Sequence, residues 1–92
     1  MAIRFEARDD VQVAFVDRTV QDGHQGARTV TYAARVMPEK DATGAVAHYR
    51  IDKTAAVGGA WLPWEAINRT EYPTPAAARR GIREWAAGEG VA

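Results

Sequence analysis

The stretch YPTPAAARRGIREWAAGEG, residues 72–90, carries a complete set of helix signals. Thr74 lies between two prolines, so it suits the N-cap position, and Pro75 suits the first helical position. Gly88 and Gly90 then end the pattern. At ~100° per residue, small and apolar side chains form one contiguous stripe along this helix. Its members are Ala78, Gly81, Ile82, Trp85 and Ala86. We expect this stripe to lie against a sheet.

The remainder of the chain shows the two-residue alternation of β-strands. The clearest case is RTVTYAARV, residues 28–36, in which apolar side chains recur at every second position. Further strands are expected over residues 3–8, 11–17, 45–51 and 60–67. The last of these is expected to be a short edge strand, because Pro63 cannot donate a hydrogen bond to a central ladder.

The connections complete the fold prediction. Residues 37–44 hold turn-forming residues, and residues 53–59 end in two glycines that should interrupt the preceding strand. Residues 17–28 are expected to form a loop longer than hairpin closure requires. We therefore predict an α+β fold in a single domain of residues 1–92. It consists of an antiparallel sheet of three to four strands with one C-terminal helix packed on one face.

The composition describes a small domain with a thin core. The chain has 92 residues, of which 19 are alanine, and Leu62 is the only leucine. Chains of this length bury a smaller fraction of their surface than larger domains and are marginally stable alone. A homodimer or a bound partner would supply the missing burial.

The same composition narrows the function classes. The chain contains no cysteine, so disulfides and thiolate metal sites are excluded. No stretch approaches the ~20 apolar residues needed to cross a bilayer, and residues 1–10 lack the apolar segment of a signal peptide. We therefore expect a cytoplasmic protein without a membrane partner. The formal net charge is zero, which is typical neither of a DNA mimic nor of a generic nucleic-acid binder.

Sorted by face, the charges are less even than the net value suggests. The outward faces of the expected strands carry several basic residues and one acidic residue, Glu6. The other acidic residues fall in the expected connections. The cations are Arg4, Arg8, Arg35, His48 and Arg50. This predicts a basic patch on the open sheet face, of the kind that can read DNA through arginine. The alternative is an ordinary solvated face.

The same two interpretations apply to the helix. Three arginines follow one another on the arc beside the apolar stripe: Arg79, Arg80 and Arg83. They either form a solvated face of the helix or bind phosphate groups.

Two further features are candidate contacts. His24 lies at the tip of the 17–28 loop, where partner contact or simple flexibility is expected, since the ligands or orienting groups of a metal or catalytic site are missing. Trp61 and Trp64 would point to opposite sides of a strand. One is then expected in the core near Trp85, and the other exposed as a binding anchor. The alternative is that both pack under the helix.

The segment GGAWLPWEAINRTEYPTPAAARRGIREWA, residues 58–86, resembles the strand-turn-helix endings of small accessory domains in phages and mobile elements. The arm-binding domains of phage integrases end in this way, and the resemblance implies a three-stranded sheet before the helix and a DNA-binding role. A neutral, arginine-rich chain of this size without catalytic motifs also resembles, in kind, the anti-CRISPR proteins of bacteriophages. That resemblance implies binding to a host protein or nucleoprotein complex.

Three function classes follow. The first is a non-enzymatic inhibitor that binds a host protein or ribonucleoprotein complex and uses neither cofactor nor metal. Its expected contacts are Arg35, Arg50, His24, Trp64 and Tyr72. The alternative is a small DNA-binding accessory module that uses the sheet face or the arginine-rich helix face. Its contacts would be Arg4, Arg8, Arg79, Arg80 and Arg83. An enzyme ranks last, since no acid–base pair or nucleophile motif is evident.

Overall fold

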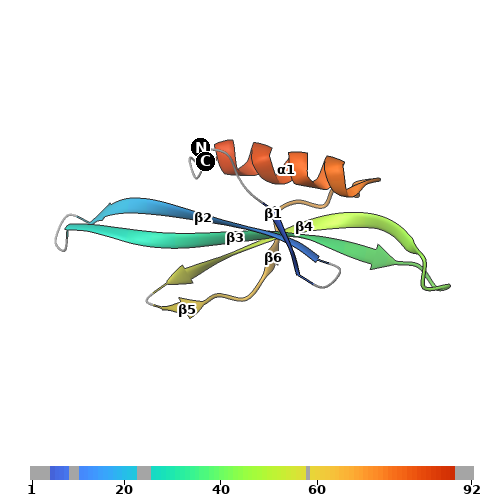
Figure 1. The fold of residues 1–92 in the computed structure, drawn as a ribbon, viewed down its shortest axis with the longest axis horizontal. Helices are drawn as coiled ribbons and strands as arrows, with labels where there is room; N and C mark the ends of the chain where they lie inside the picture. The colour runs from blue at the N-terminus through green and yellow to red at the C-terminus, as the bar shows by residue number, and fades with distance from the viewer. Residues whose placement is uncertain (1–4, 9–10, 23–25, 58, 89–92) are drawn as a thin grey trace.

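The computed structural model describes residues 5–8, 11–22, 26–57 and 59–88. They form a six-stranded antiparallel sheet and one helix (Figure 1). The elements are β1 (Phe5–Arg8), β2 (Val11–Asp22), β3 (Gly26–Lys40), β4 (Val46–Val57), β5 (Ala60–Trp61), β6 (Glu65–Ala66) and α1 (Pro75–Gly88). The strand order is β1-β2-β3-β4-β5, and β6 also pairs with β4. Helix α1 crosses one face of the sheet, and β5 lies on the side away from α1 (Figure 1).

The molecule is elongated because β2 and β3 are paired far beyond the other strands. Their register runs to Asp22↔Gly26, whereas β4 joins β3 only as far as Thr31↔Ala56. Beyond that point β2 and β3 continue as a two-stranded ribbon (Figure 1). The radius of gyration is 14.6 Å and the longest dimension is 53 Å, whereas a compact chain of this length has a radius of about 12 Å.

The core lies between α1 and the middle of β3 and β4. Ile51 and Ile82 are the largest fully buried side chains, and they pack with Ala34, Val36 and Ala78. Among the residues whose burial the structure describes, the buried apolar ones are Val13, Ala14, Ala33, Ala34, Val36, Ile51, Ala78, Ile82 and Ala86. Alanine prevails in this set, which lets the helix backbone approach the sheet closely but leaves little apolar area to bury.

The helix prediction is confirmed. The backbone N–H of Ala77 donates to the Thr74 hydroxyl at 3.1 Å, so Thr74 is the N-cap, and Pro75 is the first helical residue. The buried side of α1 contains Ala78, Gly81, Ile82 and Ala86, and Trp85 is half-buried beside them. A glycine inside a helix is unfavourable, and Gly81 has a packing reason. Two backbone hydrogen bonds join Tyr72 to Tyr49. The ring of Tyr72 then occupies the space that a Cβ at position 81 would need.

The number of strands and several boundaries differ from the prediction. The sheet has six strands rather than three or four. The expected 17–28 loop is wrong, since β2 extends to Asp22 and β3 begins at Gly26. The sequence of residues 17–28 is mostly polar, so no apolar alternation marks it as a strand, while antiparallel pairing of residues 17–22 with residues 26–31 satisfies their backbone groups. The tip residue His24 lies outside the described residues.

Two other connections are shorter than expected. Strand β3 continues to Lys40, so the turn shrinks to the neighbourhood of residues 41–44, and β4 continues to Val57 instead of ending near residue 52. The single edge strand expected over 60–67 is two strands of two residues each, β5 and β6, separated at Pro63. Proline lacks the N–H that a continuous ladder needs there.

The β3–β4 turn is organised by the Asp41 side chain. Its Oδ1 accepts hydrogen bonds from the Thr43 hydroxyl at 2.6 Å, the Thr43 N–H at 2.8 Å and the Ala45 N–H at 3.2 Å. Gly44 follows with φ 87°, a conformation that favours glycine. The hydrogen bond from the Thr43 hydroxyl is the main cause that lowers the pKa of Asp41 below its usual 3.8, with the backbone N–H groups adding to it.

The turn predicts a local titration. NMR titration of the Asp41 carboxyl should give a pKa below 3.8, and Thr43→Val should move it back toward 3.8. Because the folded pKa is the lower one, the stabilisation from this carboxylate is complete above the unfolded pKa of about 3.9. It is lost as the pH falls through the folded pKa. A pKa that does not respond to Thr43→Val would show that the hydroxyl contributes nothing.

The contact between Gly81 and Tyr72 predicts a large effect of one methyl group. A Cβ at position 81 would lie 2.7 Å from Cζ of Tyr72, so Gly81→Ala should destabilise the fold by about 1–3 kcal/mol. Gly88→Ala is the matched control, since a Cβ there meets nothing within 4 Å. The control should be neutral or stabilising by about 0.5 kcal/mol. Urea unfolding measures both, and equal effects would contradict the close packing.

Candidate functional site

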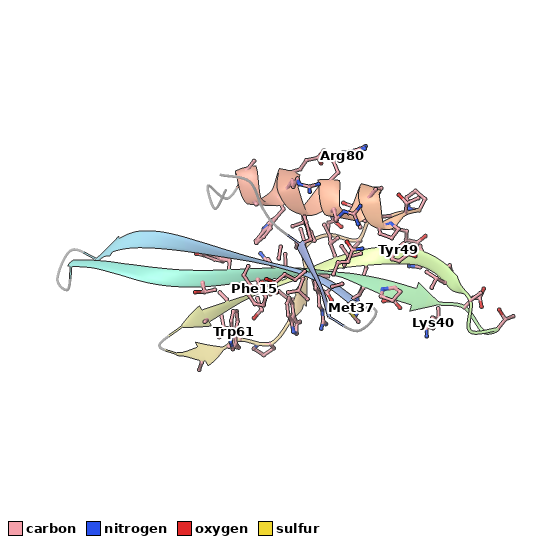
Figure 2. All side chains as sticks on the ribbon, in the orientation of Figure 1. Phe15, Met37, Lys40, Tyr49, Trp61 and Arg80 are labelled. Carbon is pink, nitrogen blue, oxygen red and sulfur yellow. The ribbon has the colours of Figure 1, made fainter. Side chains whose placement is uncertain are left out.

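Large apolar side chains gather on the sheet face that α1 does not cover. Phe15 is 39% exposed, Trp61 51%, Leu62 52% and Trp64 37%. These four residues, with Ala33 and Thr54, line a hollow of about 260 Å³, here called the aromatic hollow. Figure 2 shows Phe15 and Trp61 on the side of the sheet away from α1. Contiguous exposed apolar surface of this kind marks interaction sites.

The chain segment that carries the two tryptophans is held to β4 at both ends. Trp61 pairs with Ala56, and Leu62 is fixed by two hydrogen bonds. Its N–H donates to the carbonyl of Ala55 at 3.0 Å, and its own carbonyl accepts from the Thr54 hydroxyl at 2.6 Å. After Pro63 the chain rejoins β4 through β6. The exposed side chains between these points are therefore presented on a fixed backbone.

The two tryptophans do not alternate as predicted. Trp61 and Trp64 line the same hollow, whereas Trp85 packs on the other side of the sheet with α1. Both the expectation that one of them joins Trp85 and the alternative that both pack under the helix are wrong. The reason is Pro63, which takes residues 62–64 out of the ladder. Without a continuous strand the two-residue alternation does not apply.

Aromatic and cationic contacts order the surface of the hollow. The rings of Phe15 and Trp61 meet edge to face with their centroids 6.2 Å apart. The guanidinium of Arg35 lies over the ring of Trp64, 4.3 Å from its centroid. Such arrangements favour defined side-chain positions over a freely rotating set. Phe15 comes from β2, Arg35 from β3 and the tryptophans from the segment after β4, so only the folded sheet brings them together.

A buried carboxylate lies beneath this surface. Asp52 is 3% exposed, and its Oδ2 is 2.9 Å from Nε of Arg35 and 3.4 Å from Nε of Arg50. Arg50 also contacts Glu39. Burial lowers the pKa of Arg50, but the attraction of Asp52 and Glu39 outweighs it, so the pKa is raised and the guanidinium stays charged.

These ion pairs correct the expected basic patch. Asp52 and Glu39 were placed in connections by the sequence, but they lie in β4 and β3 on the same face as the arginines. The charges of Arg35 and Arg50 are therefore matched by neighbouring carboxylates. His48 is likewise 3.9 Å from Glu71. The described part of this face is close to neutral and partly apolar rather than basic.

Of the residues expected to bind a protein partner, Arg35, Arg50 and Trp64 lie together on the face away from α1. Tyr72 lies on the other side, packed against the core, and its hydroxyl accepts a hydrogen bond from Asn68 Nδ2 at 3.0 Å. Phe15, Trp61 and Leu62 were not among the expected contacts. Period-two alternation separates the two faces of a strand, but it does not say which face the helix covers.

The residues expected to bind nucleic acid are dispersed. Arg79 and Arg83 line a second hollow between α1 and the β1–β2 hairpin. Arg80 is exposed and points away from the sheet (Figure 2). Arg8 belongs to β1, but its side chain lies outside the described part, as does the whole of Arg4. The three helix arginines therefore do not form one surface.

The buried ion pair predicts a stability effect. Asp52→Ala leaves Arg35 without its carboxylate in a mostly buried position and should destabilise the fold by about 3 kcal/mol. Glu65→Ala is the matched control, because it removes a carboxylate from an exposed pair with Lys53 at 3.6 Å. The control should cost no more than about 1 kcal/mol. Urea unfolding that gave similar losses for both variants would contradict the role of Asp52.

Among the residues that the structure describes, no cluster of three or more potential metal ligands occurs, and no helix has the length and apolarity needed to cross a membrane. Comparisons of the chain with family models, curated proteins and solved structures return no match.

Proposed function

We propose that the chain is a non-enzymatic binding protein that docks the aromatic hollow on a host protein or nucleoprotein complex and inhibits it by covering a surface the target needs. The observation that carries this proposal is the gathering of Phe15, Trp61, Leu62 and Trp64 on one face. Tryptophan and arginine dominate the energetic centres of protein interfaces, and here Arg35 lies over Trp64.

The charges of this face favour a protein surface over a nucleic-acid backbone. Phosphate recognition depends on cations that are free to replace counterions. Arg35 and Arg50 are already paired with Asp52 and Glu39. An uncharged, partly apolar surface of a partner would bury the rings without breaking these pairs, which would be costly to leave unmatched.

The dimensions of the hollow support the same choice. Its volume of about 260 Å³ is below the range of about 300–1,000 Å³ of small-molecule sites. A protruding side chain of a protein partner fits such a hollow. The segment that presents Trp61 and Trp64 is fixed by pairing and by the Leu62 hydrogen bonds. Little conformational entropy would then be lost on docking, which favours affinity.

Inhibition by occlusion is the mode of action that suits a domain of this kind. The resemblance in kind to anti-CRISPR proteins motivates it, since such a binder acts by occupying a surface rather than by chemistry. The alternative, a DNA-binding accessory module, is supported by one observation only. Arg79 and Arg83 share a hollow and, among the described residues, form no ion pair.

The test is retention of a partner by tagged protein. The wild type and the variants Trp61→Ala, Trp64→Ala and Arg80→Ala are incubated with lysate of a CRISPR-bearing host, with and without nuclease treatment, and the retained proteins and nucleic acid are identified. Trp61→Ala and Trp64→Ala should weaken retention of a stoichiometric partner by at least about tenfold, the loss expected at an interface anchor. Arg80→Ala is the control, since Arg80 lies on the opposite side of the molecule (Figure 2).

Two outcomes would overturn the proposal. Retention of nucleic acid alone, lost on nuclease treatment and steeply weakened by salt, would favour the DNA-binding alternative. The second overturning outcome would come from sedimentation analysis. A wild-type dimer that dissociates on Trp64→Ala would show that a second copy of the chain covers the aromatic hollow. Circular dichroism melting of each variant separates loss of binding from loss of the fold.

A further inference from the structure

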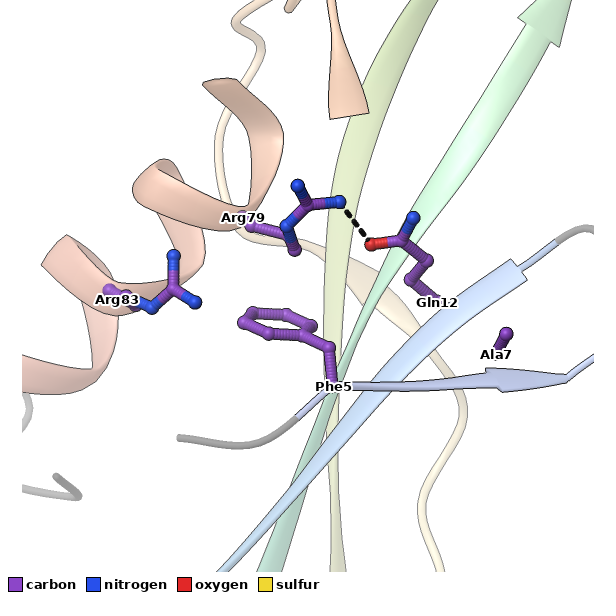
Figure 3. Close-up of a pocket in the computed structure, with 5 residues that line it drawn as sticks. All are labelled: Phe5, Ala7, Gln12, Arg79 and Arg83. Atoms are coloured by element: carbon purple, nitrogen blue, oxygen red, sulfur yellow. Dashed lines mark hydrogen bonds between the residues drawn. The ribbon is translucent and has the colours of Figure 1, made fainter. Parts of the chain in front are cut away.

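A second hollow lies on the helix side of the sheet, apart from the aromatic hollow. It is lined by Phe5 and Ala7 of β1, Gln12 of β2, and Arg79 and Arg83 of α1, and its volume is about 350 Å³ (Figure 3). We call it the arginine hollow. Its volume lies within the range of about 300–1,000 Å³ of small-molecule sites. Two guanidinium groups from successive turns of one helix thus open on one space.

Each arginine is positioned by an uncharged neighbour. Nη1 of Arg79 donates to Oε1 of Gln12 at 2.5 Å. The guanidinium of Arg83 lies over the ring of Phe5, 5.0 Å from its centroid (Figure 3). Because Oε1 of Gln12 accepts from Arg79, the other end of that amide is the Nε2 donor. Among the described residues that line the hollow, the polar side chains therefore offer mainly donors.

The charges of this hollow are not compensated within the described part of the chain. Neither Arg79 nor Arg83 forms an ion pair there, unlike Arg35 and Arg50 on the other face. Arginines at i and i+4 on a helix repel each other and destabilise it slightly. An anion between the two groups would remove that repulsion. The arrangement is thus open to a negatively charged ligand.

We propose that the arginine hollow binds a phosphate monoester group. Arg79 and Arg83 would contact its oxygens, and Nε2 of Gln12 would supply a third set of donors. A carboxylate offers two oxygens, which a single guanidinium satisfies. A phosphate monoester offers three and carries a charge of about −1.5 to −2 at pH 7, which matches two guanidinium groups better. The ring of Phe5 and the short side chain of Ala7 leave room for the group that the phosphate is attached to.

The monoester is distinguished from a nucleic-acid backbone by its charge. Each backbone phosphate is a diester with one negative charge, so it would satisfy only one of the two arginines. Arg80, which could extend a backbone contact along the helix, points away from this hollow (Figure 2). This proposal differs from the DNA-binding alternative because its ligand is a phosphate monoester and not a nucleic-acid backbone. It is also independent of the aromatic hollow, which is lined by other residues.

The test is an NMR titration of ¹⁵N-labelled full-length protein with four probes at constant ionic strength. They are phenyl phosphate, adenosine monophosphate, benzoate and an oligothymidylate without terminal phosphates. Both monoesters should shift the Gln12 side-chain amide and the Arg79 and Arg83 Nε–H signals saturably. Phenyl phosphate that binds more tightly than adenosine monophosphate would point to a phosphorylated aromatic side chain as the source. The reverse order would point to a nucleotide.

Variants locate the binding. Arg79→Gln and Arg83→Gln should each raise the dissociation constant of the monoester about tenfold or more, as expected for the loss of a charge-assisted pair. Arg80→Gln is the matched control, with the same charge change on the same helix, and should change the constant less than twofold. Ala7→Leu fills the hollow without altering charge and should also abolish binding, so the test does not depend on the arginine variants folding normally.

Three results would overturn the proposal. One is the absence of saturable shifts with either monoester up to about 20 mM, a range beyond even weak specific sites. Another is an equal effect of Arg80→Gln, which would show attraction to net charge only. The third is binding of benzoate or the oligothymidylate as tightly as the monoesters, which would assign a carboxylate or a nucleic-acid backbone instead. Failure of this test would leave the proposed role of Trp61 and Trp64 unaffected.

Discussion

The middle of strand β4, around Ile51 and Asp52, is buried on both faces and paired along both edges, and the rest of the structure is arranged around it. On one side Ile51 packs against the buried stripe of α1. On the other side Asp52 is buried with Arg35. Strand β3 runs along one edge, while β5, β6 and the bridge to Tyr72 follow the other. A single strand with an apolar and an ionic side thus holds together a chain whose core is largely alanine.

The position of β4 makes the two sides of the molecule chemically different. On the side away from α1, the return of the chain along β4 places exposed aromatic rings over a neutralised set of charges. On the helix side, Arg79 and Arg83 meet the β1–β2 hairpin without a described carboxylate partner. We have proposed that the first arrangement docks on a protein surface, because burying the rings there need not break the ion pairs of Arg35 and Arg50. The second suits a small anion, because two positive groups share one space.

Local rules predicted those elements whose signals lie within one segment. The helix N-cap at Thr74 and the buried stripe of α1 around Ile82 could be predicted from the sequence. Capping and the 3.6-residue period depend only on residues that are neighbours in the chain. The outward placement of Arg35 followed from alternation in the same way. The ribbon formed by β2 and β3 could not be predicted, since its sequence is mostly polar and shows no apolar alternation. The sequence also did not predict that Trp61 and Trp64 lie on the same face, because this depends on where the chain leaves the ladder at Pro63.

The amino-acid sequence by itself determined the α+β class, the extent of α1, and how side chains alternate between the two faces in the middle of β3 and β4. Those features follow from backbone geometry, which every short segment carries in its own residues. Only the tertiary structure decided that Phe15 of β2 lies on the face away from α1, that Asp52 lies between Arg35 and Arg50, and that Phe15 meets Trp61. These contacts join residues far apart in the chain. They depend on strand order and register, which are set by burying the apolar stripe of the helix and by matching charges across strands.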